Sequence, residues 1–195
     1  MAGRLVVVRH GKTVAHGTFV GRSDAALSDL GKEEALRAGD NLKHTGLNID
    51  VAFTATSQRC IDTAQATLQR AGYDGNSAIK IGALVARDYG RFTGRCIDEE
   101  PQDWLSFTYR PPGGETRQEV HARVSVFCSS RLQPLLDGGK TVLVVASRTS
   151  IDELKRVLDG QNRDPTNSRL ELQHGELRVY EYYPGLGCKP VCGAQ

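Results

Sequence analysis

The stretch Leu5-Val6-Val7-Val8-Arg9-His10-Gly11 places an apolar run directly before a cation, an imidazole and a glycine. An apolar, β-branched run of this length is typical of a buried strand in a parallel sheet. The residues that follow would then lie at the carboxyl end of the strand, where open α/β sheets bind ligands. Arginine binds oxyanions through two donors, and histidine can act as a nucleophile or a general base near neutral pH. The stretch therefore predicts chemistry on a phosphoryl group; a charged strand end before a turn glycine is the alternative.

The rest of the chain alternates strand patterns with amphipathic helix patterns. We expect further strands at 51–54 and 141–146, and a short strand with its exit at 79–85. We also expect a hairpin at 170–183 that turns at His174-Gly175, and helices at 28–43, 57–70, 116–136 and 150–158. Ser28 is the expected N-cap of the first helix and Thr149 or Ser150 that of the last, while Pro134 disturbs the end of the long one. The sequence therefore predicts an α/β three-layer sandwich, a mostly parallel sheet with helices on both faces. A single domain over 1–185 is followed by a tail at 186–195.

The composition is that of an ordinary soluble globular protein. Its 195 residues can bury one sizeable core, and its net charge of +2 is too small to indicate a nucleic-acid partner. The sequence has no apolar run of membrane-span length and no long apolar segment of a secretory signal at its start. The five cysteines are typical of reduced thiols, with a disulfide or a metal at Cys188 and Cys192 as the alternative. We therefore expect an intracellular protein, in the cytoplasm or in an organelle.

Polar residues also follow the other expected parallel strands. Arg59 opens the helix after the second strand, where a helix N-terminus already favours anions; a solvated surface arginine is the alternative. The third strand exit carries Arg87-Asp88-Tyr89-Gly90, and the fourth carries Ser147-Arg148. Because the carboxyl ends of parallel strands meet at one edge of a sheet, we expect these residues around one crevice with Arg9 and His10.

Taken in order, these motifs make the chain resemble the histidine phosphatase superfamily, in its phosphoglycerate-mutase-like branch. The matching stretches are residues 7–13, 19–24, 27–31, 57–64, 89–94, 113–116 and 139–146. They cover nearly the whole chain in order and with compatible spacing. The resemblance implies a phosphoglycerate-mutase-like fold that needs no metal and no other cofactor, because the cationic pocket stabilises the charge.

The family transfers a phosphoryl group through a phosphohistidine, and the resemblance implies corresponding roles here. His10 matches the nucleophile, while Arg9 and Arg59 match the pair that holds the phosphate oxygens. Thr13 matches a hydroxyl position near the phosphate. A second histidine completes the family pocket, and a glutamate protonates the leaving oxygen. The residues that match substrate contacts of the mutase branch are Arg87 and Tyr89.

The chain departs from the family pattern at both remaining catalytic positions. Ala86 stands where the family has its glutamate, and Ser147 stands where it has its second histidine. Loss of a general acid costs about 10²–10⁴-fold in rate, and loss of one donor to the developing charge costs about 10²–10³-fold. The departures predict a degenerate catalytic site. Arg148, in place of a family glycine, is expected to fill the pocket or to point outward; a replacement cation is the alternative.

Another group would have to replace the missing acid if the site turns over. Asp88 and Glu115 are the candidate substitute acids, with solvated or capping carboxylates as the alternative. His16 is a spare imidazole in the loop after the first strand. His121 is expected on a helix surface, and His174 is expected to be a turn residue.

Three functions remain open from the sequence. It favours a pseudoenzyme that keeps a phosphate pocket around His10 and acts as a binding or structural subunit with protein partners. The alternative is an active phosphomonoesterase, less readily a mutase, that forms a phosphohistidine at His10 with the help of a substitute acid. A scaffold without a ligand is the third. A phosphate ester is the expected ligand, whereas nucleic acid and membrane insertion are not expected.

Overall fold

The computed structural model describes residues 2–99, 102–160 and 172–191. These residues form a six-stranded sheet in the order β3-β2-β4-β1-β5-β6. The strands are β1 (Gly3–Arg9), β2 (Val51–Ala55), β3 (Ile79–Ile81), β4 (Thr141–Ala146), β5 (Leu177–Tyr183) and β6 (Gly187–Pro190). The first four strands run parallel, while β5 pairs antiparallel with β1 and β6 pairs antiparallel with β5. The predicted mostly parallel sheet is confirmed.

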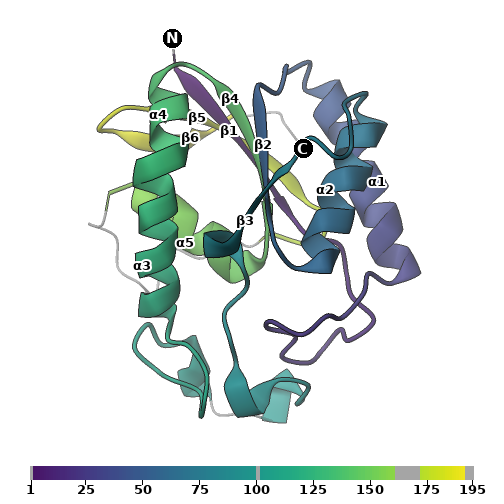
Figure 1. The fold of residues 1–195 in the computed structure, drawn as a ribbon, viewed down its shortest axis with the longest axis vertical. Helices are drawn as coiled ribbons and strands as arrows, with labels where there is room; N and C mark the ends of the chain where they lie inside the picture. Colours follow the sequence, from purple (N-terminus) through teal and green to yellow (C-terminus); the bar gives the residue numbers. More distant parts are fainter. Residues whose placement is uncertain (1, 100–101, 161–171, 192–195) are drawn as a thin grey trace.

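Helices cover both faces of this sheet (Figure 1). One face carries α1 (Asp29–His44) and α2 (Gln58–Arg70), and the other carries α3 (Arg117–Phe127), α4 (Gln133–Asp137) and α5 (Arg148–Leu158). Successive side chains of β1 point to opposite faces, so Val6 and Val8 pack with α1 and α2. Leu5 and Val7 pack on the other side. Burial on both faces explains the uninterrupted apolar run, and the predicted three-layer α/β sandwich is confirmed.

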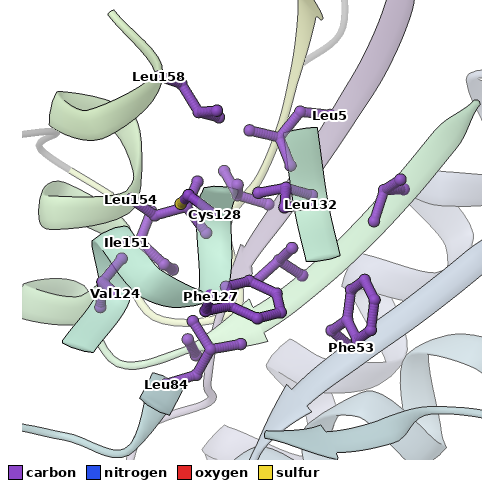
Figure 2. Close-up of a cluster of buried hydrophobic side chains, with 14 of the residues drawn as sticks. Leu5, Phe53, Leu84, Val124, Phe127, Cys128, Leu132, Ile151, Leu154 and Leu158 are labelled. Atoms are coloured by element: carbon purple, nitrogen blue, oxygen red, sulfur yellow. The ribbon is translucent and has the colours of Figure 1, made fainter. Parts of the chain in front are cut away.

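The larger core cluster lies between the sheet and α3 to α5 (Figure 2). The rings of Phe53 from β2 and Phe127 from α3 make an edge contact with their centroids 5.2 Å apart. Ile151 and Leu154 of α5 are fully buried in the same cluster. Each such side chain contributes about 1.5–3 kcal/mol of burial free energy. This packing fixes α5, whose first turn reaches the carboxyl end of the sheet.

The helix predicted over 116–136 begins as expected and is then interrupted. Thr116 caps α3 through a reciprocal pair of hydrogen bonds with Glu119. A π-helical segment, Cys128–Leu132, separates α3 from α4. Pro134 has no N–H, and its ring would collide with the carbonyl of residue 130 in a regular α-helix. A wider turn ahead of the proline relieves that collision, so the distortion precedes Pro134 and the helix continues to Asp137.

The C-terminal part differs from its prediction. The hairpin that the structure describes is β5–β6, joined by residues 184–186, whereas His174-Gly175 lies in the turn before β5. The expected boundary at residue 185 therefore cuts through a hairpin, because Gly187–Pro190 is an edge strand and not a tail. Cys188 is a buried free thiol in that strand. Cys192 and the expected start of the first hairpin strand, at 170–171, lie outside the described residues.

Candidate active site

A pocket of about 250 Å³ is lined by residues at the carboxyl ends of the parallel strands and by residues of the segment between β3 and α3. Its strand-end residues are Arg9 and His10 after β1, Arg59 after β2, Ala86 and Arg87 after β3, and Ser147 and Arg148 after β4. Further wall residues include Thr13, Tyr89 and His174. The structure thus brings together residues that are far apart in the sequence, as expected for strand ends at one edge of a sheet.

His10 is held as a neutral imidazole by hydrogen bonds at both ring nitrogens. It is 7% exposed, and its Nδ1 donates to the carbonyl oxygen of Gly11 at 2.8 Å. Its Nε2 accepts from Arg59 Nε at 3.3 Å. Burial, and secondly the charge of Arg59, lowers the pKa of His10 to about 3. Nε2 is therefore unprotonated at neutral pH, as a nucleophile requires, and its lone pair accepts the bond from Arg59 in this structure.

The backbone next to His10 is fixed by a close approach of α1. A Cβ on Gly11 would lie 2.2 Å from the carbonyl oxygen of Gly31, so only glycine fits there. The amide N–H of Gly11 donates to Thr63 Oγ1 of α2 at 3.1 Å. Both helices on this face of the sheet therefore hold the turn that carries His10.

Arg59 is buried and its donors bind protein groups. Its Nη1 donates to the carbonyl of Ser23 at 2.8 Å, and its Nη2 donates to the carbonyl of Gly21 at 2.5 Å. At 1% exposure it is not the solvated surface residue that the sequence left open. The guanidinium connects the start of α2 to the loop after β1 and lies against His10.

Arg9 binds the segment before β5 through its guanidinium. Its Nη1 donates to the carbonyl of Leu172 at 2.7 Å, and its Nη2 donates to His174 Nε2 at 2.8 Å. The Nε is buried and has no hydrogen-bond partner among the residues that the structure describes. Burial, and secondly the nearby charge of Arg148, lowers the pKa of Arg9 to about 10, so the guanidinium stays charged at neutral pH. Arg9 lines the pocket, so its charge would attract an anion there.

Thr13 and Tyr89 line the pocket on its loop side. Thr13 is buried, and its backbone pairs with Leu27 in an isolated β-bridge. The ring of Tyr89 lies 4.8 Å from that of Phe19 and 6.1 Å from that of Trp104. These aromatic rings give the outer part of the pocket an apolar wall.

Arg87 lines the pocket but its guanidinium holds the chain. It is 1% exposed and donates to the carbonyls of Glu115, Trp104 and Tyr109, each at 2.7 Å. These three bonds hold together the segment between β3 and α3. The geometry favours a structural role for Arg87, whereas the substrate contact that the family resemblance implied stays a prediction.

The two positions that depart from the family pattern both lie in the pocket wall. Ala86 is 6% exposed and Ser147 is 7% exposed. Ser147 Oγ lies 3.1 Å from Ser150 Oγ, which donates to the carbonyl of Val85 at 3.1 Å. The Ser147 hydroxyl is thus held by hydrogen bonds that run through Ser150 to the backbone. Neither Ala86 nor Ser147 has a side chain that titrates near neutral pH.

The two expected substitute acids are not among the residues that line the pocket. Glu115 accepts from Arg123 at 2.9 Å and 3.0 Å, and Arg22 lies 3.2 Å from it. Asp88 accepts from the amide N–H of Gly90 at 2.8 Å. The capping and ion-paired alternative therefore describes both carboxylates better than a role as proton donor in this pocket.

The first turn of α5 adds a cation and a carboxylate that lie one helical turn apart. α5 begins at Arg148 with Ser147 as its N-cap, and not at Thr149 or Ser150 as predicted. The Arg148 side chain is 44% exposed, and its Nε lies 4.0 Å from Asp152 Oδ2. Both residues line the pocket. Arg148 neither fills the pocket nor points wholly outward. Sequence reasoning missed Asp152, which lies beside Arg148 because residues four positions apart are neighbours on a helix surface.

His174 is the other residue that sequence reasoning missed. The ring centroid of His174 lies 5.6 Å from that of His10 and 5.9 Å from that of His16. Burial, and secondly the charge of Arg9, lowers the pKa of His174 to about 3. No local sequence signal identifies it, because its place depends on the antiparallel pairing of β5 with β1. His121, expected on a helix surface, instead contacts the buried Glu153 at 3.2 Å.

The part of the chain that the structure describes has neither a candidate membrane span nor a candidate metal cluster. None of its helices has the length and apolar character needed to span a membrane. Within the same residues, no cluster of three or more histidine, cysteine, aspartate or glutamate side chains has an arrangement that could hold a metal ion.

Comparison with known proteins gives one consistent family. The profile of the histidine phosphatase superfamily (branch 1) matches residues 5–187. The 2,3-bisphosphoglycerate-dependent phosphoglycerate mutase of Bartonella tribocorum is 34% identical over 195 residues, covering 94% of each chain. The enzyme of the same name from Rhizobium etli is 38% identical over 166 residues, covering 80% of this chain and 79% of that one.

Solved structures give the same fold at lower identity. The alpha-ribazole phosphatase of Shigella flexneri has a TM-score of 0.81 at 20% identity, covering 98% of this chain and 96% of that one. A mycobacterial glucosyl-3-phosphoglycerate phosphatase has a TM-score of 0.79 at 22% identity, covering 97% of both chains. The fold, the profile match and the relatives along most of the chain lead to one assignment: this protein belongs to the histidine phosphatase superfamily, among its phosphoglycerate-mutase-like members.

Proposed function

We propose that this protein binds a phosphate monoester over His10 and turns it over slowly or not at all. The observation that carries the proposal is a contrast within one pocket. His10, Arg9 and Arg59 line it, and so do Ala86 and Ser147. The first three offer a nucleophile and positive charge, whereas the last two offer neither a proton at neutral pH nor a charge.

The charges around His10 support binding of a phosphate dianion. His10 is a neutral imidazole, while Arg59 donates to it and Arg9 lines the same pocket, so the pocket carries positive charge before the ligand enters. Arg9 lines the pocket and its guanidinium stays charged at neutral pH. A phosphate oxygen beside it can accept a charge-assisted hydrogen bond. Charge-assisted hydrogen bonds of this kind are stronger than neutral ones.

The missing proton donor supports slow turnover. An alkoxide is a poor leaving group unless a general acid protonates it, and such an acid typically contributes about 10²–10⁴-fold. Ala86 cannot do this, and Glu115 and Asp88 are engaged with arginines or with backbone N–H groups outside the pocket lining. Phosphoryl transfer to His10 would then be restricted to esters with good leaving groups.

An active phosphomonoesterase is the second candidate, and two observations favour it. His10 presents an unprotonated Nε2 beside Arg59, as formation of a phosphohistidine requires. Asp152 is a carboxylate in the pocket wall. The relatives named as phosphoglycerate mutases make a phosphoglycerate the first natural ester to test.

Turnover and binding measurements separate these candidates. We expect the protein to bind inorganic phosphate in a calorimetric titration and to hydrolyse 4-nitrophenyl phosphate slowly, with hydrolysis lost in His10→Ala. We expect 3-phosphoglycerate to be hydrolysed at least about 10²-fold more slowly than the aryl ester, because its leaving oxygen needs a proton. Equal rates on the two esters, lost in Asp152→Asn, would establish the active enzyme instead. Failure to bind phosphate would overturn the proposal altogether.

A protein that binds a phosphate ester without turnover would serve as a binding or structural subunit. We predict protein partners from this proposed role alone, because the structure contains no second chain. Light scattering of the purified protein, with and without inorganic phosphate, measures whether its oligomeric state depends on the ligand. Affinity capture on the wild type and on Arg9→Gln then tests whether binding of a partner depends on the occupied pocket.

A further inference from the structure

We propose that His174 is a phosphate-binding residue of this pocket, a donor that the turn before β5 places beside Arg9. The inference rests on the proposed binding of a phosphate monoester over His10. It adds a contact from a part of the chain to which neither the sequence motifs nor the family resemblance assigned a role.

The sheet topology places this turn at the site. β5 runs antiparallel to β1, with Leu177 opposite Val8, so the start of β5 lies beside the end of β1. The amide N–H of Gly175 donates to the carbonyl of Arg9 at 2.9 Å, and the amide N–H of Arg9 donates to the carbonyl of Glu176 at 3.3 Å. The ladder between the two strands therefore continues into the turn and fixes it next to the residue that precedes His10.

Packing leaves the turn little freedom. Gly175 has a φ of +67°, and a Cβ there would lie 2.8 Å from the carbonyl oxygen of Glu34. The amide N–H of Gln173 donates to Glu176 Oε2 at 2.6 Å across the turn. The imidazole of His174 is thus carried on a braced backbone between α1 and β1, which is the condition for a preorganised contact.

The contact with Arg9 determines which nitrogen of His174 carries the proton. A guanidinium has only donors, so Nε2 of His174 accepts the 2.8 Å bond from Arg9 Nη2 and the proton lies on Nδ1. Nδ1–H has no hydrogen-bond partner among the described residues. The side chain is partly buried and lines the same pocket as His10, with the two ring centroids 5.6 Å apart.

A neutral donor suits this place. The positive groups around His174 are Arg9 on β1, Lys12 in the following loop and Arg148 on α5, with His16 beside them, and together with burial they keep the imidazole uncharged. A neutral imidazole with its proton on Nδ1 can donate to a phosphate oxygen while Nε2 still holds Arg9. His174 in the turn before β5 and the charged Arg9 of β1 would then act on the same anion, since both line the pocket.

Two amide variants distinguish this role from a structural one. The amide of asparagine takes the place of the imidazole Nδ1, whereas the amide of glutamine takes the place of Nε2. If His174 binds phosphate, calorimetric titration with inorganic phosphate should show about 10–100-fold weaker binding for His174→Ala and His174→Gln. His174→Asn should retain most of the affinity. His44→Ala, an exposed histidine at the end of α1, serves as the matched control.

The outcomes separate this inference from the function it rests on. If the wild type does not bind phosphate, the proposed function fails. If the wild type binds and His174→Ala binds equally well, only the role of His174 fails. Retention of affinity in His174→Gln but not in His174→Asn would show that the imidazole merely holds Arg9, and would overturn the proposal.

A measurement on the wild type keeps the test independent of how the variants fold. Nitrogen-15 NMR spectra of the histidine side chains can be assigned by through-bond correlations. The Nδ1 chemical shift of His174 should change on saturation with inorganic phosphate. The signals of His44 should stay in place. An unchanged His174 signal at saturation would overturn the proposal even if every variant unfolds.

Discussion

Ala86 creates a defined gap at the scale of a single residue. Its methyl group is buried in the pocket wall, while its carbonyl oxygen accepts from Arg22 at 3.4 Å and from Arg123 at 3.3 Å. Those two arginines also bind Glu115. The backbone of this position is therefore fixed, and what this position lacks is a side chain with an acidic group.

Replacing this side chain should restore part of the missing chemistry. We expect Ala86→Glu to raise the hydrolysis rate of alkyl phosphates by about 10²–10⁴-fold, because it returns a general acid to the pocket wall. The rate on 4-nitrophenyl phosphate should change far less, since that leaving group needs little protonation. Steady-state rates on the two esters test this. Ala86→Gln is the matched control, and equal rates for the glutamate and glutamine variants would show that no acid role exists at this position.

The two buried histidines should make stability depend on pH. Folding lowers the pKa of His10 and of His174 from 6.5 to about 3. Between these values the unfolded chain binds protons that the folded chain does not, so the free energy of unfolding falls as pH drops below about 6.5. Urea unfolding at a series of pH values should show a smaller decrease for His174→Asn than for the wild type. The exposed His44→Ala should keep the wild-type dependence, and parallel curves for all three proteins would contradict this prediction.

The site residues that could be predicted are those whose local sequence places them. Arg9 and His10 follow an apolar strand, and Arg59 opens a helix, so each could be assigned to the strand-end edge from the sequence alone. Their hydrogen-bond partners could not, because the carbonyls that bind Arg59 belong to a loop of irregular structure. His174 was missed because an antiparallel partner brings the residues before its start, and not those after its end, to the site.

At the scale of elements, a buried charge cluster joins α3 to α5. Glu153 is fully buried, and Arg117 donates to it at 2.6 Å and 3.0 Å. His121 and Arg156 lie 3.2 Å from the same carboxylate. Arg117 also lines the pocket, so the cluster connects the packing of two helices to the pocket wall.

Removing the charge of this carboxylate should destabilise the whole domain. We expect Glu153→Gln to lower the free energy of unfolding by about 3–5 kcal/mol, because it leaves buried cations without their counter-ion. Urea denaturation monitored by circular dichroism measures the change. Glu33→Gln is the control, since Glu33 pairs with Arg37 at 4.0 Å on the exposed side of α1 and should leave stability within error. A loss as small as that of the control would show that the cluster has no net stabilising role.

Element boundaries followed the sequence where a local signal sets them. Ser28 accepts the capping hydrogen bond of α1 as predicted, and the run Thr141–Ala146 forms β4. The start of α5 was misplaced because three hydroxyl residues near it could all serve as caps. The π segment and β6 were missed because the first depends on how a proline is accommodated within a packed helix and the second on pairing with β5.

At the scale of the whole molecule, the pocket exists only when the sheet is assembled. Its walls come from the ends of four parallel strands and from the turn before an antiparallel one. Arg59 and Arg87 each donate to backbone carbonyls of distant loops, so the same interactions that close the fold also shape the pocket. An anion bound between these elements should therefore stabilise the domain as a unit.

Inorganic phosphate should raise the stability of the folded protein by mass action. At a concentration one hundred times the dissociation constant, we expect the free energy of unfolding to rise by about 2.7 kcal/mol, because the unfolded chain offers no such pocket. Urea unfolding with and without phosphate, at constant ionic strength, measures this increment. Arg9→Gln should lose most of it, since Arg9 contributes a positive charge to the pocket lining. Arg4→Gln, an exposed position on the same strand, should retain it. Equal increments in the two variants would mean that phosphate stabilises the protein from a site other than the pocket around His10.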